Sequence, residues 1–156
     1  MGGMKNLNRR DLCVALSAFA AMGSVAANAQ AIGEKTLSES AAFPFDKLPV
    51  KRSANGAESR HVTQGVLPTG EYVEMHETLL PPGQMPHPAH KHRHSEFMMI
   101  REGTVEFDND GEKTQLGPGG VIFAASDKMH GLKNVGTVPA QYFVIAIGRE
   151  SGMQRV

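Results

Sequence analysis

The chain has 156 residues, and its 16 lysines and arginines balance its 16 aspartates and glutamates. A protein without excess positive charge is not expected to bind nucleic acid through its phosphates, which sets that class of partner aside. The 40% apolar fraction is typical of a soluble domain, whereas 17 glycines and 9 prolines indicate many turns rather than a helical bundle. Composition therefore favours a turn-rich, all-β protein.

Residues 1–29 have the pattern of a secretory signal peptide. The start is basic, residues 12–27 are apolar or small and carry no charge, and Ala27-Asn28-Ala29 is a cleavage site of the A-x-A type. Arg9 and Arg10 resemble a twin-arginine export signal, with an ordinary Sec signal as the alternative. We expect a periplasmic or secreted protein that has no membrane segment once the signal is removed.

After the signal, residues 30–42 are predicted to be a flexible leader and residues 43–156 a single domain. The only cysteine, Cys13, lies inside the signal, so the mature chain has no thiolate to act as a nucleophile or a ligand. Any metal ion must therefore be held by histidines and carboxylates.

Short strands follow one another through the domain. Alternating or β-branched runs predict strands at residues 58–66, 71–79, 96–100, 104–108, 121–125 and 141–147. Turn signals separate them at residues 81–83, 109–111 and 117–120. A series of this kind closes its edges as a sandwich or a barrel, and no stretch of it has a helical period of useful length.

Potential metal ligands are concentrated in one stretch. Four of the seven histidines lie at positions 87–94, in the run His87-Pro-Ala-His90-Lys-His92-Arg-His94-Ser-Glu96. On an extended chain, residues two apart face the same side, so His90, His92 and Glu96 can point toward one ion. A neighbouring strand could bring His130 to the same centre. The alternatives are adventitious metal capture or a solvated basic rim for the cluster, and a structural role for His130.

Two segments resemble the motifs of the cupin superfamily. Residues 83–103 are similar to the first motif, G-x5-H-x-H-x3,4-E-x6-G, although six residues instead of five separate Gly83 from His90. Residues 119–134 are similar to the second motif, G-x5-P-x-G-x2-H-x3-N, with Ala125 in place of the proline and Asp127 in place of the glycine. The positions that supply metal ligands are intact in both.

This resemblance implies a small single-domain cupin, with a jelly-roll β-barrel around a divalent metal ion. It assigns the ligands as His90, His92, Glu96 and His130, and it leaves His87 and His94 as rim residues. A competing register through His92, His94 and Glu96 does not fit the motif spacing. Three imidazoles and a carboxylate suit Mn, Fe, Ni, Cu or Zn, and ligand type does not choose among them.

The resemblance further implies a metal-dependent enzyme that acts on an oxygenated small molecule, with dioxygenase-type chemistry first and isomerisation or decarboxylation next. The alternative is a noncatalytic small-molecule or metal-binding module, since the same fold hosts all of these functions. Tyr72 and His76, which share one face of a predicted strand, are the candidates for acid–base residues near the ion.

Cupins commonly pair through strand edges and N-terminal arms, and Phe43-Pro44-Phe45 could be such an arm. The resemblance therefore leads us to expect a homodimer. The alternative is that this short aromatic segment packs back onto its own barrel.

Overall fold

The computed structural model describes residues 35–149; the predicted signal peptide lies outside them. Within this part of the chain there are nine strands and one short 3-10 helix, and the prediction of an all-β domain is confirmed. In chain order the elements are η1 (Phe45–Lys47), β1 (Val50–Arg52), β2 (Glu58–Val66), β3 (Tyr72–Leu80), β4 (Ser95–Glu102), β5 (Val105–Asn109), β6 (Glu112–Leu116), β7 (Val121–Ala124), β8 (His130–Asn134) and β9 (Ala140–Ile147).

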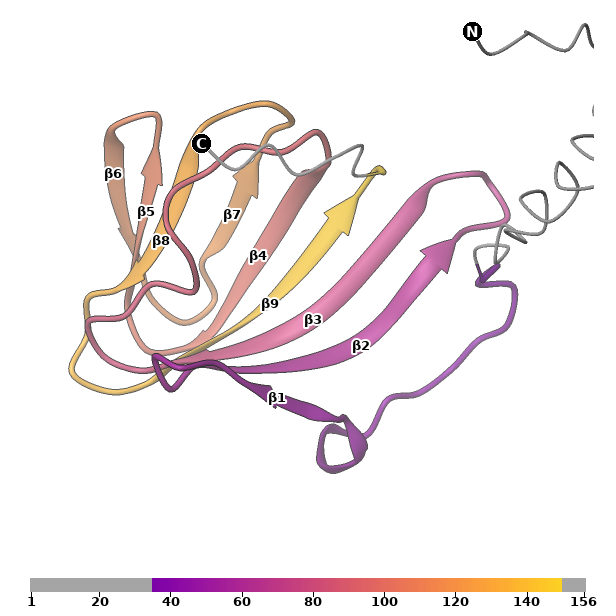
Figure 1. The fold of residues 1–156 in the computed structure, drawn as a ribbon, viewed down its shortest axis with the longest axis horizontal. Coiled ribbons are helices and arrows are strands. Elements are labelled where there is room, and N and C mark those ends of the chain that lie inside the picture. Colours follow the sequence, from indigo (N-terminus) through magenta and orange to yellow (C-terminus); the bar gives the residue numbers. More distant parts are fainter. Residues whose placement is uncertain (1–34, 150–156) are drawn as a thin grey trace, which may run out of the picture. The chain divides into compact units, whose positions relative to one another are not determined.

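The strands form two antiparallel sheets. The larger has the order β1-β2-β3-β9-β4-β7 and the smaller the order β6-β5-β8 (Figure 1). Most neighbours in the larger sheet are distant in the sequence; β9, for example, pairs with both β3 and β4. Long-range pairing of this kind brings segments from the middle and the end of the chain to one centre.

The core follows from the two-residue period of the strands. In β4, Met98 and Ile100 are buried, whereas Phe97 and Met99, which alternate with them, face outward and are exposed. The smaller sheet contributes Phe107 and other apolar residues to the same cluster. Its buried members include Leu80, Met98, Ile100, Val105, Phe107, Ile122, Leu132, Ala140, Tyr142 and Val144. Apolar burial between the two sheets therefore holds the domain together.

The connection between β3 and β4, residues 81–94, is hydrogen-bonded to β8. Near its start, the Gly83 amide donates to the Asn134 carbonyl over 2.9 Å, and the Asn134 amide donates to the Gln84 carbonyl over 3.0 Å. Further along, His90 and His130 exchange two backbone hydrogen bonds of 2.9 Å each. The histidine-rich stretch thus lies along a strand of the smaller sheet.

The N-terminal segment packs on its own domain. The guanidinium of Arg60 lies 4.6 Å from the centre of the Phe45 ring, and that of Arg101 lies 5.7 Å from it. Before this segment, the Leu37 amide donates to the carbonyl of Val66 in β2. The homodimer and the boundaries of the leader stay predictions. In the described part of the chain, no helix has the length and hydrophobicity needed to cross a membrane.

Candidate metal centre

The four predicted ligands come from three segments of the fold. Glu96 is the second residue of β4 and His130 the first of β8, whereas His90 and His92 precede β4 on the 81–94 connection. His90 forms an isolated antiparallel bridge with His130, and His92 lies outside the named strands. The carbonyl of His92 accepts a 2.7 Å hydrogen bond from the Asp127 amide, which ties it to the segment before β8.

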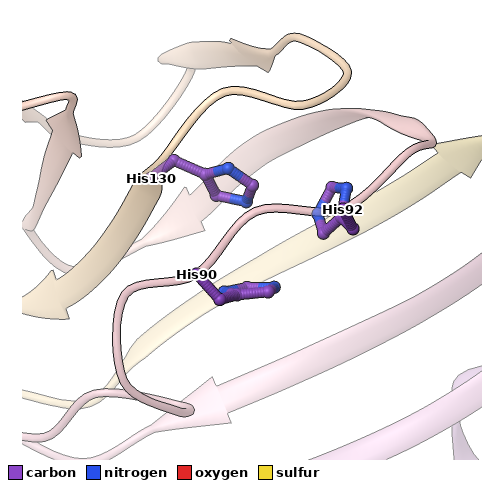
Figure 2. A group of neighbouring side chains, drawn as sticks. All are labelled: His90, His92 and His130. Atoms are coloured by element: carbon purple, nitrogen blue, oxygen red, sulfur yellow. The ribbon is translucent and has the colours of Figure 1, made fainter. Parts of the chain in front are cut away.

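The structure brings all four side chains together. One ring nitrogen from each of His90, His92 and His130 lies within 4.8 Å of the other two, and Figure 2 shows the three rings gathered around one space. The Glu96 carboxylate lies beside two of them. Its Oε1 is 3.4 Å from Nε2 of His92, and its Oε2 is 3.7 Å from Nε2 of His130. A single ion can therefore be reached from three imidazoles and one carboxylate.

Hydrogen bonds fix which ring nitrogens are available. Nδ1 of His92 lies 2.8 Å from the His94 carbonyl oxygen, and Nδ1 of His130 lies 2.9 Å from that of Lys128. A carbonyl oxygen only accepts, so both Nδ1 atoms carry the proton and each Nε2 presents a lone pair. Backbone partners of this kind are what orients histidine ligands in metal sites.

Unpaired polar atoms test whether the residues fit an ion. Nδ1 of His90 and Nε2 of His130 are buried and have no hydrogen-bond partner among residues 35–149. A buried polar atom left without a partner costs roughly 1–3 kcal/mol, and such atoms are rare in folded proteins. Both belong to the converging rings, so the donor set matches a nitrogen- and oxygen-binding ion such as Mn, Fe, Ni, Cu or Zn.

The protonation states also suit a metal ion. Burial, together with the nearby rings of His87, His130 and His92, lowers the pKa of His90 to about 4, so this imidazole is neutral at pH 7. Burial by itself would raise the pKa of Glu96, but the nearby imidazoles of His130, His92 and His94 outweigh it and hold that pKa below its usual value. The site therefore presents a neutral imidazole and a charged carboxylate without losing protons first.

The two histidines predicted for the rim differ from each other. His87 is exposed, and its ring lies edge-on to that of His90 with 4.2 Å between the ring centres. The side chain of His94 is only 11% exposed, and its Nε2 lies 3.0 Å from Oε1 of Glu96. His94 thus contacts a predicted ligand, and the rim description fits His87 alone.

His92, His94 and Glu96 also lie close enough together to be considered as a metal site. The rings of His92 and His94, however, are stacked nearly parallel, with 3.6 Å between their centres and 8° between their planes. An ion shared by them would lie about 1.8 Å, half that separation, out of each ring plane, whereas imidazoles bind ions at roughly 2.0–2.1 Å along the nitrogen lone pair. The stacking therefore favours His94 as a support for His92 and Glu96.

Tyr72 and His76 lie on β3 and line two different hollows. His76 lines a cavity of about 250 Å³ together with Glu96 and His130. Tyr72 lines a second hollow of about 440 Å³, which Glu74, His94 and Glu96 also line. Both predicted acid–base residues are near the centre, but His76 shares its cavity with two of the predicted ligands.

Sequence reasoning missed Glu74. Its carboxylate oxygens lie 2.9 and 3.1 Å from Nδ1 of His76. The two residues are two apart on β3, and that spacing was the available signal, since it places both side chains on one face of a strand.

Comparisons with known proteins agree with this geometry. Residues 76–146 match the sequence profile of the family described as "Cupin domain". Many solved structures share the arrangement of strands; one of them is an RmlC-like cupin from Shewanella frigidimarina, with a TM-score of 0.61, 17% identity, and coverage of 72% of this chain and 93% of that one. The domain has the cupin fold. Sequence and structure together support placing it in the cupin superfamily.

Other cupin-fold structures carry varied names. A predicted oxalate decarboxylase from Thermotoga maritima matches with a TM-score of 0.60 and 19% identity over 70% of this chain and all of that one. The polyketide cyclase RemF from Streptomyces resistomycificus matches with a TM-score of 0.60 and 14% identity over 76% of this chain and 86% of that one. The comparison with curated proteins found no significant match. At these identities, the likeness establishes the fold alone.

Proposed function

We propose that this cupin is an exported, metal-dependent enzyme that acts on a small oxygenated molecule. The observation that carries the proposal is the convergence of His90, His92 and His130 on one point beside the Glu96 carboxylate. With Nδ1 of His92 and His130 tied to backbone carbonyls, the lone pairs of their Nε2 atoms are directed by the fold. Export is supported by the signal pattern of residues 1–29.

A divalent ion bound by these residues would supply Lewis-acid polarisation of an oxygen ligand and positions at which that ligand exchanges. The protein contributes one negative charge from Glu96, so a bound divalent ion keeps a net charge near +1, which favours anionic or chelating oxygen donors. The ligand set alone leaves Mn, Fe, Ni, Cu and Zn as alternatives.

The cavity beside the ligands sets the size and character of the substrate. At about 250 Å³ it is smaller than the roughly 300–1,000 Å³ pockets that take drug-sized molecules. Met98, Leu132 and Val144 give it apolar walls, and Thr78 and Tyr142 add hydroxyl groups. Burial raises the pKa of the Tyr142 phenol, so this group stays a neutral hydrogen-bond donor. The lining favours a compact molecule with a few oxygen atoms.

Two reaction classes are open to such a centre: oxidation by dioxygen, and proton transfer or decarboxylation within the bound molecule. The names of two proteins with this fold, a predicted oxalate decarboxylase and a polyketide cyclase, support small oxygenated substrates. The second candidate function is a noncatalytic metal-binding module, which the same convergence of donors supports equally well.

Turnover separates the two functions. Protein purified without a histidine tag and loaded in turn with each of the five metals would be assayed against catechols, flavonols, diketones and sugar derivatives, with and without oxygen. We expect oxygen uptake or product formation with at least one metal, lost in His130→Ala and kept in Lys133→Ala, a change to an exposed neighbour in β8. Full metal loading without any conversion would favour the binding module.

A further inference from the structure

His76 has the contacts of a positioned proton-transfer group. It lies on β3 and lines the 250 Å³ cavity together with Glu96 and His130. Its Nδ1 lies 2.9 Å from one oxygen of Glu74 and 3.1 Å from the other. Both groups are partly buried, with 28% of the His76 side chain and 25% of the Glu74 side chain exposed. Glu74 is therefore well placed to control the His76 ring.

The chemistry of this contact determines the tautomer of the ring. A carboxylate only accepts hydrogen bonds, so Nδ1 of His76 carries the proton and Nε2 holds the lone pair. A carboxylate in this position keeps an imidazole in one orientation and stabilises the imidazolium that forms when Nε2 takes up a proton. His76 is thereby prepared to accept a proton from a molecule in the cavity.

Glu74 has a second neighbour that serves as a comparison. Nδ1 of His61, the residue paired with His76 on β2, lies 3.5 Å from Oε1 of Glu74. This distance is longer than those to His76, and the His61 side chain is 48% exposed. His61 contacts Glu74 but is not among the residues that line the cavity, so it serves as a control for His76.

The other titratable groups that line the cavity have ion-pair or hydrogen-bond partners or belong to the predicted ligand set. Glu58 is paired with Arg52 at 2.9 Å and with Arg60 at 3.0 Å. Glu96 and His130 belong to the predicted ligand set. Nδ1 of His87, at the exposed end, donates to the Pro88 carbonyl, and the Tyr142 hydroxyl is a buried donor. Among the histidines that line the cavity outside the predicted ligand set, His76 is the one whose ring is held by a carboxylate of the described residues.

We propose that His76, held by Glu74, is the general base of this cupin, and that its substrates are small α-hydroxy carbonyl compounds. This inference rests on the proposed function. Such a molecule carries two adjacent oxygen atoms that can bind one ion, and a carbon-bound hydrogen beside them that is acidified by the carbonyl group.

The reaction balances without an added oxidant or reductant. The C–H bond at the hydroxyl-bearing carbon breaks, and its proton goes to Nε2 of His76. The freed electron pair forms a carbon–carbon double bond, while the carbonyl π pair moves onto oxygen. Return of the proton from Nε2 to the adjoining carbon, with passage of the hydroxyl proton to the former carbonyl oxygen, gives the isomeric carbonyl compound. Return to the original carbon regenerates the starting compound, and in D₂O the returned nucleus is deuterium.

Deuterium exchange provides the test. The zinc-loaded protein would be incubated in D₂O with hydroxyacetone, and the loss of the CH₂ proton signal would be followed by NMR. General-base catalysis typically contributes about 10²–10⁴-fold, so we expect His76→Gln to slow exchange by at least about 100-fold and Glu74→Gln by at least about tenfold. His61→Gln should exchange at the wild-type rate, and all three variants should keep full zinc content.

A second measurement does not depend on turnover. Nitrogen-15 NMR of the zinc-loaded protein should show the Nδ1–H tautomer for His76, changing to a mixture of tautomers in Glu74→Ala but not in His61→Gln. An Nε2–H tautomer in the wild type would overturn the proposal. So would equal exchange rates in wild type and His76→Gln, or loss of zinc from the His76 and Glu74 variants.

The outcomes also separate this inference from the proposed function. A wild-type protein that binds zinc and converts other compounds, but does not exchange hydroxyacetone protons, would overturn only the role of His76. A wild-type protein that binds no metal would overturn the proposed function itself.

Discussion

The predicted ligands of this cupin-fold domain are held by two kinds of backbone. Glu96 and His130 lie in β4 and β8, where the ladder hydrogen bonds of a sheet fix the direction of each side chain. His90 and His92 lie on the 81–94 connection, which is held by a few separate hydrogen bonds to β8 and to the segment before it. The sheets therefore fix the positions of Glu96 and His130. The positions of His90 and His92 can change when one of the hydrogen bonds that hold the connection is broken.

Removal of a ligand should have the largest effect, and it should differ between these two pairs of ligands. In His90→Ala, the connection can bring in His87, whose ring centre is 4.2 Å from that of His90. Within β8, by contrast, no second histidine can replace His130. Loss of a residue that only orients a ligand costs roughly 10- to 100-fold in metal affinity. We expect the metal affinity of His130→Ala to fall by more than this, and that of His90→Ala to fall less than that of His130→Ala.

Competition titration with a chromophoric chelator measures both affinities. The double variant His87→Ala/His90→Ala should be as weak as His130→Ala. Equal losses in the two single variants would show that the connection is as rigid as the strands.

Loss of the side-chain hydrogen bonds of Asn134 should have the next largest effect, and this effect is on the stability of the fold. This side chain is fully buried and donates to the carbonyls of Leu80 and Val138 over 2.8 and 2.9 Å, and its Oδ1 accepts from the Gly136 amide. Asn134→Ala removes all three hydrogen bonds, the one to the Leu80 carbonyl being buried, so we expect the free energy of unfolding to drop by about 3 kcal/mol in urea denaturation.

Lys133→Ala, an exposed change in the same strand, should leave the free energy of unfolding within about 0.5 kcal/mol of the wild type. If Asn134→Ala were equally mild, the start of the connection would be held by the backbone bonds at Gly83 and Gln84 alone.

His94 should matter to metal binding although it is not a predicted ligand. It stacks on His92 and lies 3.0 Å from Glu96, so it supports one donor from each pair of ligands. We expect His94→Ala to weaken metal affinity by about 10- to 100-fold, which is typical for contacts that orient ligands. His87→Ala is the matched control and should change metal affinity by less than about threefold. An equally small change in His94→Ala would mean that His94 is a rim residue that does not support the ligands.

A smaller effect is expected on the pH dependence of stability in the metal-free protein, and it comes from His90 on the 81–94 connection. The pKa of His90 is about 4 in the folded protein and 6.5 in a free histidine, so between these values the unfolded chain takes up a proton that the folded chain does not. Stability should therefore fall as the pH drops from about 6.5 to about 4.

The lowered pKa of Glu96 extends this loss to pH values below 4.5. Urea midpoints measured in EDTA should show a shallower pH dependence in His90→Ala. An unchanged slope would mean that His90 is solvated when the metal is absent.

Much of this arrangement could be predicted from the sequence. The alternating runs that became β2, β3 and β5 have the period of half-buried strands, β9 comes from a β-branched and aromatic run, and Asn109-Asp110-Gly111 forms the tight turn between β5 and β6. There Asp110 has φ 54° and Gly111 φ 95°, values that Asp and Gly adopt at little cost. The motif spacing picked out four side chains that do lie together.

Other features depend on tertiary contacts that no local pattern records. The β6 strand reads Glu-Lys-Thr-Gln-Leu and is almost wholly exposed, so it lacks an apolar alternation and forms because it pairs with β5. The contacts of His94 depend on the ring of His92 stacking against it. Likewise, the backbone at His92 is held by a hydrogen bond from Asp127, more than thirty residues away in the sequence.

Glu96 lines both the cavity of His76 and the hollow of Tyr72, so its side chain acts as a partition between them. Truncation at this position would remove a donor and open a passage between two compartments in a single change. Glu96→Ala would then alter solvent access and substrate confinement together with metal affinity. Glu96→Gln keeps the volume of the partition, so comparing these two variants separates the effect of the lost charge from that of the opened wall.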